Sequence, residues 1–231
     1  MIGLRKTVAT LAVAAAFGLG AAGPASAGEE QALVDKSRIT VEAFTTDKQM
    51  VNMRAMLREA RGVIVVPQLL KGGFIVGGSG GSGVLMARDR DRNAWSAPSF
   101  ITMGSGSIGA QFGAEAQQLV LLIMTDKGMN AVLNHKVTLG GEASIAVGPV
   151  GAGAEAATTT GLGADIYSFG RSKGLFAGVA LEGAVIESRD DYNRNYYGRA
   201  VTPKDVLFDW SVVKPDADGL KKALIAAGAA G

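Results

Sequence analysis

Three arginines on one predicted helix are the residues of this sequence whose spacing best suits anion binding. Arg54, Arg58 and Arg61 lie at positions i, i+4 and i+7, which places their side chains on the same side of an α-helix. Guanidinium groups bind phosphates and carboxylates through paired hydrogen bonds. The spacing therefore predicts a surface for anions or lipid headgroups. The alternative is a solvated helix face whose side-chain stems cover apolar neighbours.

A second basic pair, Arg171 and Lys173, belongs to a Ser/Gly-rich loop between two predicted strands. Backbone N–H groups in a tight turn bind phosphate, and the two cations would add charge to such a site. We therefore count both residues among the candidates for anion binding. An ordinary polar hairpin turn is the alternative interpretation.

Groups for catalysis are scarce in this chain. It has no cysteine and a single histidine, His135, which excludes disulfides, cysteine nucleophiles and multi-histidine metal sites. Glu182, Glu187, Asp190 and Asp191 are the best candidates for an acid–base pair, but nothing in their spacing places them in one pocket. We expect no enzyme activity, no cofactor and no metal.

Glycine patterns in this sequence imitate a nucleotide site without meeting its requirements. Two stretches match G-x-G-x-x-G, one starting at Gly78 and one at Gly104, but a dinucleotide site needs a strand before the pattern and a helix after it. The first stretch precedes a predicted strand. The second precedes residues 110–118, which could be helical, yet no alternating β and α units continue from there. We therefore expect no nucleotide site.

Residues 1–27 have the three parts of a secretory signal peptide. Arg5 and Lys6 supply positive charge, residues 8–19 form an apolar run too short to span a bilayer, and a small-residue cleavage site ends at Ala27. We predict cleavage near Ala27 and export of the remaining chain, which would be periplasmic or secreted.

The processed chain, residues 28–231, is long enough for one domain with a substantial core. Hydrophobic residues make up 48% of the sequence, which excludes a disordered chain. Loss of Arg5 and Lys6 reduces the 23 basic residues to the number of acidic residues, 21. The net charge is then about zero. This disfavours a nucleic-acid partner, because nucleic-acid binding normally needs a basic excess.

The elements that position these side chains begin with two helices. Between Asp47 as N-cap and Gly62 as stop, Met50, Met53 and Leu57 form an apolar stripe at helical spacing. Another helix is expected just before this one. Thr202 followed by proline predicts a short helix over 203–209, and residues 220–227 predict a final helix.

From Val63 onwards, short apolar runs alternate with glycine, and the first run ends at Pro67. The expected strands are 63–66, 73–77, 83–87, 119–125, 142–148, 151–157, 164–169 and 175–186. Such spacing favours an α+β fold, in which an antiparallel, Gly-rich sheet is curled into a barrel or sandwich and packed by the helices. The expected core side chains are Val65, Phe74, Ile75, Val84, Trp95, Phe100, Leu121, Ile123, Ile145, Tyr167, Phe176 and Val179.

Seven motifs in a fixed order carry a family likeness. They are Gly77–Val84, Trp95–Phe100, Ser107–Gly113, Leu139–Pro149, Tyr167–Gly178, Leu181–Gly183 and Asn195–Gly198. This series resembles the SYLF domain, a lipid-binding module of eukaryotic membrane-traffic and actin-patch proteins. The likeness covers about residues 30–210, which is nearly the whole processed chain.

The resemblance implies a domain that binds anionic phospholipid or phosphoinositide at a membrane surface, without catalysis. It also implies that a basic amphipathic N-terminal segment makes the lipid contact. The matching positions here are Arg54, Arg58 and Arg61, together with Lys71. Some eukaryotic members bind actin, but predicted export makes actin an improbable partner of this chain. The alternative function is a structural or protein-interaction component of the cell envelope without lipid activity.

Overall fold

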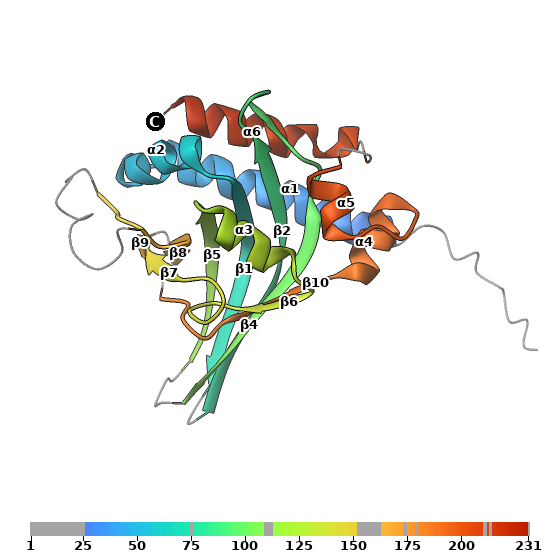
Figure 1. Cartoon of the computed structure of the whole chain (residues 1–231). Coiled ribbons are helices and arrows are strands. Elements are labelled where there is room, and N and C mark those ends of the chain that lie inside the picture. The colour runs from blue at the N-terminus through green and yellow to red at the C-terminus, as the bar shows by residue number, and fades with distance from the viewer. Residues whose placement is uncertain are drawn as a thin grey trace, which may run out of the picture.

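A layer of helices covers one face of a long, curved sheet (Figure 1). The computed structural model describes residues 26–73, 76–108, 113–151, 163–172, 175–178, 180–209, 212 and 214–230. The helical elements are α1 (Ser26–Thr46), η1 (Lys48–Met50), α2 (Val51–Glu59), α3 (Asp126–Leu133), α4 (Asp190–Tyr197), α5 (Pro203–Leu207), η3 (Pro215–Ala217) and α6 (Asp218–Ala229).

In the residues that the structure describes, ten strands form one sheet, and the α+β fold with a curled antiparallel sheet is confirmed. The strands are β1 (Gly62–Gly73), β2 (Val76–Asp89), β3 (Ala94–Trp95), β4 (Ser99–Ile108), β5 (Gly113–Ile123), β6 (Lys136–Thr138), β7 (Ile145–Val147), β8 (Ile166–Ser172), β9 (Leu175–Gly178) and β10 (Val185–Ser188). The expected strand over 175–186 is thus divided between β9 and β10. Of the expected strand 151–157, residues 152–157 lie outside the described residues.

The sheet curls because its two ends are joined by a short stretch of chain. Its strands follow the order β6-β10-β4-β2-β1-β5-β8-β7, with β3 beside β2 and β9 beside β8. Eight flat strands about 4.8 Å apart would separate β6 from β7 by about 34 Å. The chain from Thr138 to Ile145 spans at most about 25 Å. The sheet therefore has to bend into a half-barrel.

One half of the sheet is buried on both faces. Successive side chains of a strand point to opposite faces, so Val63 and Val65 contact the helix-side core while Ile64 and Val66 contact a second core. The helix-side core contains Phe44, Met50, Met53, Leu57, Phe100, Phe169 and Leu224. The second core contains Leu85, Ile101, Leu121, Met129, Val137 and Ile186. Burial on both sides explains the continuous apolar run at the start of β1.

Most of the expected core side chains that can be assessed are buried. Those that are buried are Val65, Val84, Trp95, Phe100, Leu121 and Ile123. Ile145 and Tyr167 are partly buried and pack against the two cores. Phe74, Ile75 and Val179 lie outside the described residues, and so does the side chain of Phe176.

The helix expected between Asp47 and Gly62 is present, but it is shorter and ends differently. The Asp47 carboxylate caps η1 by accepting a hydrogen bond from the Gln49 N–H at 2.7 Å. The helix ends at Glu59, and Gly62 opens β1. Glycine is needed there for close packing, because a Cβ at Gly62 would lie 2.8 Å from the Met129 sulfur.

Two segments that look like turns are helices. The Asp-Lys-Gly sequence after Thr125 forms the first turn of α3, where the Gly128 N–H donates to the Thr125 hydroxyl at 2.9 Å. The acidic stretch from Asp190 forms the first turn of α4. The expected C-terminal helices are present as α5 and α6. Among the described residues, no helix is long and apolar enough to cross a membrane.

Candidate ligand-binding site

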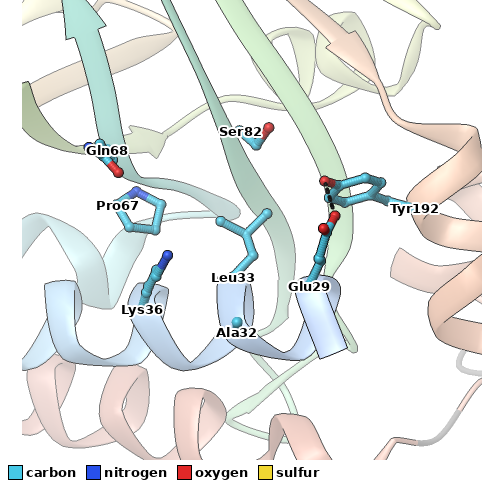
Figure 2. Close-up of a pocket in the computed structure, with 8 residues that line it drawn as sticks. All are labelled: Glu29, Ala32, Leu33, Lys36, Pro67, Gln68, Ser82 and Tyr192. Carbon is cyan, nitrogen blue, oxygen red and sulfur yellow. Dashed lines mark hydrogen bonds between the residues drawn. The ribbon is translucent and has the colours of Figure 1, made fainter. Parts of the chain in front are cut away.

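A pocket of about 330 Å³ lies between α1 and the sheet. Its lining comes from α1, β1, β2 and α4 and consists of Glu29, Ala32, Leu33, Lys36, Pro67, Gln68, Ser82 and Tyr192. Figure 2 shows Lys36 pointing towards Pro67 and Gln68 at one end of the pocket, while Glu29 points towards Tyr192 at the other end. The pocket therefore has a basic end and an acidic end.

A β-bulge shapes the strand side of this pocket. Between Val65 and Leu70, β1 advances by five residues while its partner β2 advances by four, and the pairing of β1 with β5 shifts in the same region. Pro67 has no backbone N–H, so it suits a place where the ladder is interrupted. The prediction that the first strand ends at Pro67 is therefore wrong, because β1 continues through the bulge to Gly73.

Two glycines allow β2 to pass close to the bulge. A Cβ at Gly81 would lie 2.3 Å from the carbonyl oxygen of Gln68, and a Cβ at Gly83 would lie 2.4 Å from that of Val65. Both distances are far shorter than van der Waals contact, and both involve backbone atoms. The first glycine pattern therefore serves close strand packing. Its second counterpart, which starts at Gly104, lies within β4.

Helix α4 holds the first turns of α1 and orients the acidic end of the pocket. Three side-chain hydrogen bonds join the two helices: Tyr192 to Glu29 at 3.3 Å, Asn195 to Glu30 at 3.3 Å, and Tyr196 to Gln31 at 3.1 Å.

Tyr192, which contacts Glu29 in the pocket, is itself fixed by an ion pair of α4. The Arg189 guanidinium lies 3.7 Å from the centre of the Tyr192 ring and pairs with the Asp191 carboxylate at 2.7 Å. The hydrogen bonds from Arg189 lower the pKa of Asp191 to about 2. The pair is therefore charged at neutral pH and keeps the aromatic ring in place.

Beyond the pocket, the long central strands continue past the helices and leave one face of the sheet exposed (Figure 1). Leu69 belongs to the second core, so Leu70 points to the opposite, helix-side face. The residues on this face are aligned across neighbouring strands in two rows, one through Leu70 and one through Gly72. We call this surface the distal face; it comprises Leu70, Gly72, Gly78, Gly80, Gly104, Gly106 and Ala116. The Leu70 side chain is 55% exposed, and the surrounding residues are glycine or alanine.

The structure separates the three arginines that were predicted to act together. Arg54 donates hydrogen bonds to the carbonyl oxygens of Thr45 at 3.0 Å and Asp47 at 2.7 Å, so it fastens α2 to the end of α1. Arg61 pairs with the Asp126 carboxylate at 2.7 Å. Arg58 is exposed on the last turn of α2.

The other predicted basic residues lie on different parts of the sheet. Lys71 follows Arg61 by ten residues, which corresponds to about 30 Å along a strand, so it cannot share one headgroup with the arginines of α2. Arg171 belongs to β8 and donates to the side-chain oxygen of Gln118 at 3.4 Å. Lys173 lies outside the described residues.

The residues considered for catalysis do not converge on the pocket. His135 is exposed, with Glu187 and Asp190 each 3.6 Å from one of its ring nitrogens. Asp191 is paired with Arg189. In the part of the chain that the structure describes, no three His, Asp or Glu side chains gather as metal ligands. The charged and polar side chains that line the pocket can hold a small polar group.

Glu29, Lys36 and Tyr192 line the pocket, and sequence reasoning did not select them. Two signals point to them in retrospect. Glu29 and Lys36 lie seven residues apart, which places them on one side of a helix. Pro67 interrupts an apolar run that is otherwise typical of a central strand, and proline in such a position marks a bulge.

Comparison with known proteins gives a consistent set of matches. A family model described as "Ysc84: Las17-binding protein actin regulator" matches residues 104–227. Protein YSC84 of Saccharomyces cerevisiae is 37% identical over 172 residues, which are 73% of this chain and 36% of that protein. An SH3 domain-containing protein of Schizosaccharomyces pombe is 37% identical over 183 residues, which are 78% of this chain and 42% of that protein.

A human relative extends the same pattern. The SH3 domain-containing YSC84-like protein 1 of Homo sapiens is 35% identical over 154 residues, which are 66% of this chain and 44% of that protein. The chain therefore spans less than half the length of these curated relatives.

Proposed function

Because the chain belongs to the Ysc84 family, the family of the SYLF domain, we propose that it is a non-catalytic module that binds anionic phospholipid or phosphoinositide-type headgroups at a membrane surface. The resemblance that the ordered motifs indicate is confirmed by the family match. The family description speaks of binding and regulation, which is consistent with a module that carries out no reaction.

The observation that carries the proposal is the exposed apolar surface beside a charged pocket. On the distal face, the exposed Leu70 side chain is surrounded by glycines. Ser82, which lines the pocket, lies two residues from Gly80 on the same face of β2. An apolar surface that continues into a polar pocket matches an amphiphile, which has an apolar chain and a polar head.

The size of the distal face favours a lipid over a large protein partner. Four strands about 4.8 Å apart and two rows of residues about 7 Å apart give a surface of about 19 Å by 14 Å, or roughly 250 Å². Stable protein interfaces bury about 800 Å² on each partner. The distal face alone is therefore too small for such an interface, whereas it is large enough for an acyl chain.

Basic residues around the helix layer would add electrostatic attraction to an anionic membrane. Lys36 and Arg58 are exposed, and Arg171 belongs to β8. Each cation near an anionic surface contributes about 1 kcal/mol. Binding that depends on a few such residues is weak and falls with salt.

A protein partner is the second candidate function, because the family description names Las17 binding and actin regulation. For this chain we propose that actin is an improbable partner, since residues 1–27 predict export to the periplasm or the exterior. Under this second candidate, the chain would be a structural or protein-interaction component of the cell envelope without lipid activity.

Co-sedimentation of the purified protein with vesicles of graded anionic content tests the proposal. We expect binding that rises with anionic lipid, falls with salt and decreases in Leu70→Ser and Arg58→Glu. Val147→Ser is the matched control, since Val147 is 51% exposed on β7, away from the distal face. Absence of binding at every composition would overturn the lipid proposal and favour the protein partner.

A further inference from the structure

We propose that the pocket between α1 and the β1 bulge binds a zwitterionic headgroup that carries both an ammonium and a phosphate, of the phosphoethanolamine type. This inference rests on the proposed membrane function: the exposed cations outside the pocket would attract the anionic surface, and the pocket would select a zwitterionic lipid within that membrane. It concerns different residues from the arginines of α2.

The pocket presents one positive and one negative side chain that have no charged partner of their own. Lys36 and Glu29 both line it and both are exposed. Within the described residues, neither side chain takes part in an ion pair. In the same part of the chain, the one hydrogen bond that the Glu29 carboxylate accepts is the long bond from Tyr192, at 3.3 Å. The carboxylate and the ammonium face one pocket but do not pair with each other. A ligand that carries both a positive and a negative group would complement them.

The separation of the two charges limits the length of the ligand. Glu29 and Lys36 are seven residues apart on α1, which corresponds to about 10.5 Å along the helix axis. A charge-assisted hydrogen bond of about 2.8 Å at each end leaves about 5 Å between the charged atoms of the ligand. A two-carbon linker joins an ammonium nitrogen to a phosphate oxygen through five bonds of about 1.5 Å, and when partly folded it covers this gap.

Uncharged polar groups complete each end of the pocket. Gln68 lies with Lys36 at the basic end, where its amide can donate to phosphate oxygens (Figure 2). Tyr192 lies with Glu29 at the acidic end, and its hydroxyl keeps the carboxylate turned towards the pocket. The ammonium of the ligand therefore meets Glu29, and its phosphate meets Lys36 and Gln68.

The position of the pocket also fits a headgroup whose lipid chains lie on the sheet. Ser82 lines the pocket, and Gly80, two residues further towards the hairpin, belongs to the distal face beside Leu70. A purely anionic headgroup would meet the same Lys36 but would be repelled by Glu29. The carboxylate is thus the group that distinguishes a zwitterion from an anion.

Titration of the protein with three soluble probes tests this inference, with NMR shifts or calorimetry as the readout. The probes are phosphoethanolamine, inorganic phosphate and ethanolamine. We expect phosphoethanolamine to bind more tightly than either half. Glu29→Gln should weaken phosphoethanolamine binding about fivefold without weakening phosphate binding, whereas Lys36→Gln should weaken both. Lys222→Gln is the matched control, since Lys222 is an exposed lysine of α6, and it should change neither.

Two outcomes would overturn the inference. The first is phosphate binding as tight as phosphoethanolamine binding together with no loss in Glu29→Gln, since the pocket would then bind anions only. The second is no binding of any probe. Vesicle co-sedimentation separates this inference from the proposed function. Wild-type binding to anionic vesicles that is unchanged in Glu29→Gln and Lys36→Gln would leave the lipid function standing and remove the pocket from it.

Discussion

The carbonyl oxygen of Gln68 lies where a side chain on Gly81 would have to begin, since a Cβ at Gly81 would be only 2.3 Å from it. The bulge in β1 therefore requires a glycine at the facing position of β2. The bulge pushes the backbone towards β2, and only glycine leaves room for it. This feature shapes the strand side of the pocket.

The first prediction concerns this contact. Gly81→Ala should destabilise the protein by about 1–3 kcal/mol, because the new methyl group meets backbone that cannot rotate away. Gly72→Ala is the control, since a Cβ at Gly72 has nothing within 4 Å. Urea unfolding of both variants measures the difference. Equal stability of the two variants would show that the bulge relaxes freely.

The second prediction separates Arg54 from Arg58. Arg54→Met should lower stability by about 1–3 kcal/mol, because the carbonyl oxygens of Thr45 and Asp47 lose a charged donor. Arg58→Met should change stability by less than about 0.5 kcal/mol, since its side chain is exposed. Thermal or urea unfolding distinguishes the two. A stable Arg54→Met variant would contradict the role of Arg54 as a fastener of α2.

The third prediction concerns the buried carboxylate of Asp165, which accepts hydrogen bonds from Thr125, Ser144 and Lys127. Burial alone would raise its pKa, but these hydrogen bonds outweigh burial and hold the pKa of Asp165 well below its ordinary value. Asp165→Asn should therefore lower stability at pH 7 by about 1.5–3 kcal/mol.

The same residue gives a pH dependence with a definite sign. Because the pKa of Asp165 is lower in the folded state, its stabilisation is fully present above the unfolded pKa of about 4 and is lost as the pH falls further. The difference between wild type and Asp165→Asn should shrink between pH 7 and pH 3, as measured by urea unfolding. Asp209→Asn, at an exposed position, should show no such trend. A constant difference for Asp165→Asn would argue against the carboxylate as its source.

The fourth prediction concerns Tyr197, a partly buried tyrosine of α4. The Tyr197 hydroxyl donates to the Pro98 carbonyl oxygen at 2.6 Å, and burial raises the pKa of Tyr197 above its ordinary value. Tyr197→Phe should destabilise the protein by about 1–2 kcal/mol, because it leaves the carbonyl group without its donor. Tyr192→Phe removes only a 3.3 Å bond and should have a smaller effect in the same unfolding experiment.

The sequence predicts the elements whose apolar residues recur at a clear helical or strand spacing. The stripe of Met50, Met53 and Leu57 is buried as expected, because a helix that covers a sheet must be apolar on one side. The helices α3 and α4 escape prediction because their first turns consist of residues that also favour turns. Burial of Met129 and Tyr196 against the cores outweighs that local preference.

The site is harder to predict because its parts come from distant segments. Helical spacing predicts Arg61 on the same helix face as Arg54. This is wrong, because α2 ends at Glu59 and Arg61 instead pairs with Asp126 of another element. The pocket likewise needs α1, the bulge at Pro67 and Tyr192 of α4 at once. Contacts over such separations follow from sheet pairing and helix packing, which a single sequence does not display.

The curled sheet has a consequence for the behaviour of the protein at high concentration. Its outermost strands are short: β6 and β7 have three residues each, and β9 has four. The long central strands β1 and β2 are paired on both sides, whereas β4 and β5 have a second neighbour only at residues 101–104 and 117–123. The unpaired backbone groups of an edge strand can form hydrogen bonds with another chain and so start aggregation, and a short edge strand offers few such groups. The half-barrel thus keeps its two central strands, β1 and β2, away from the edges of the sheet.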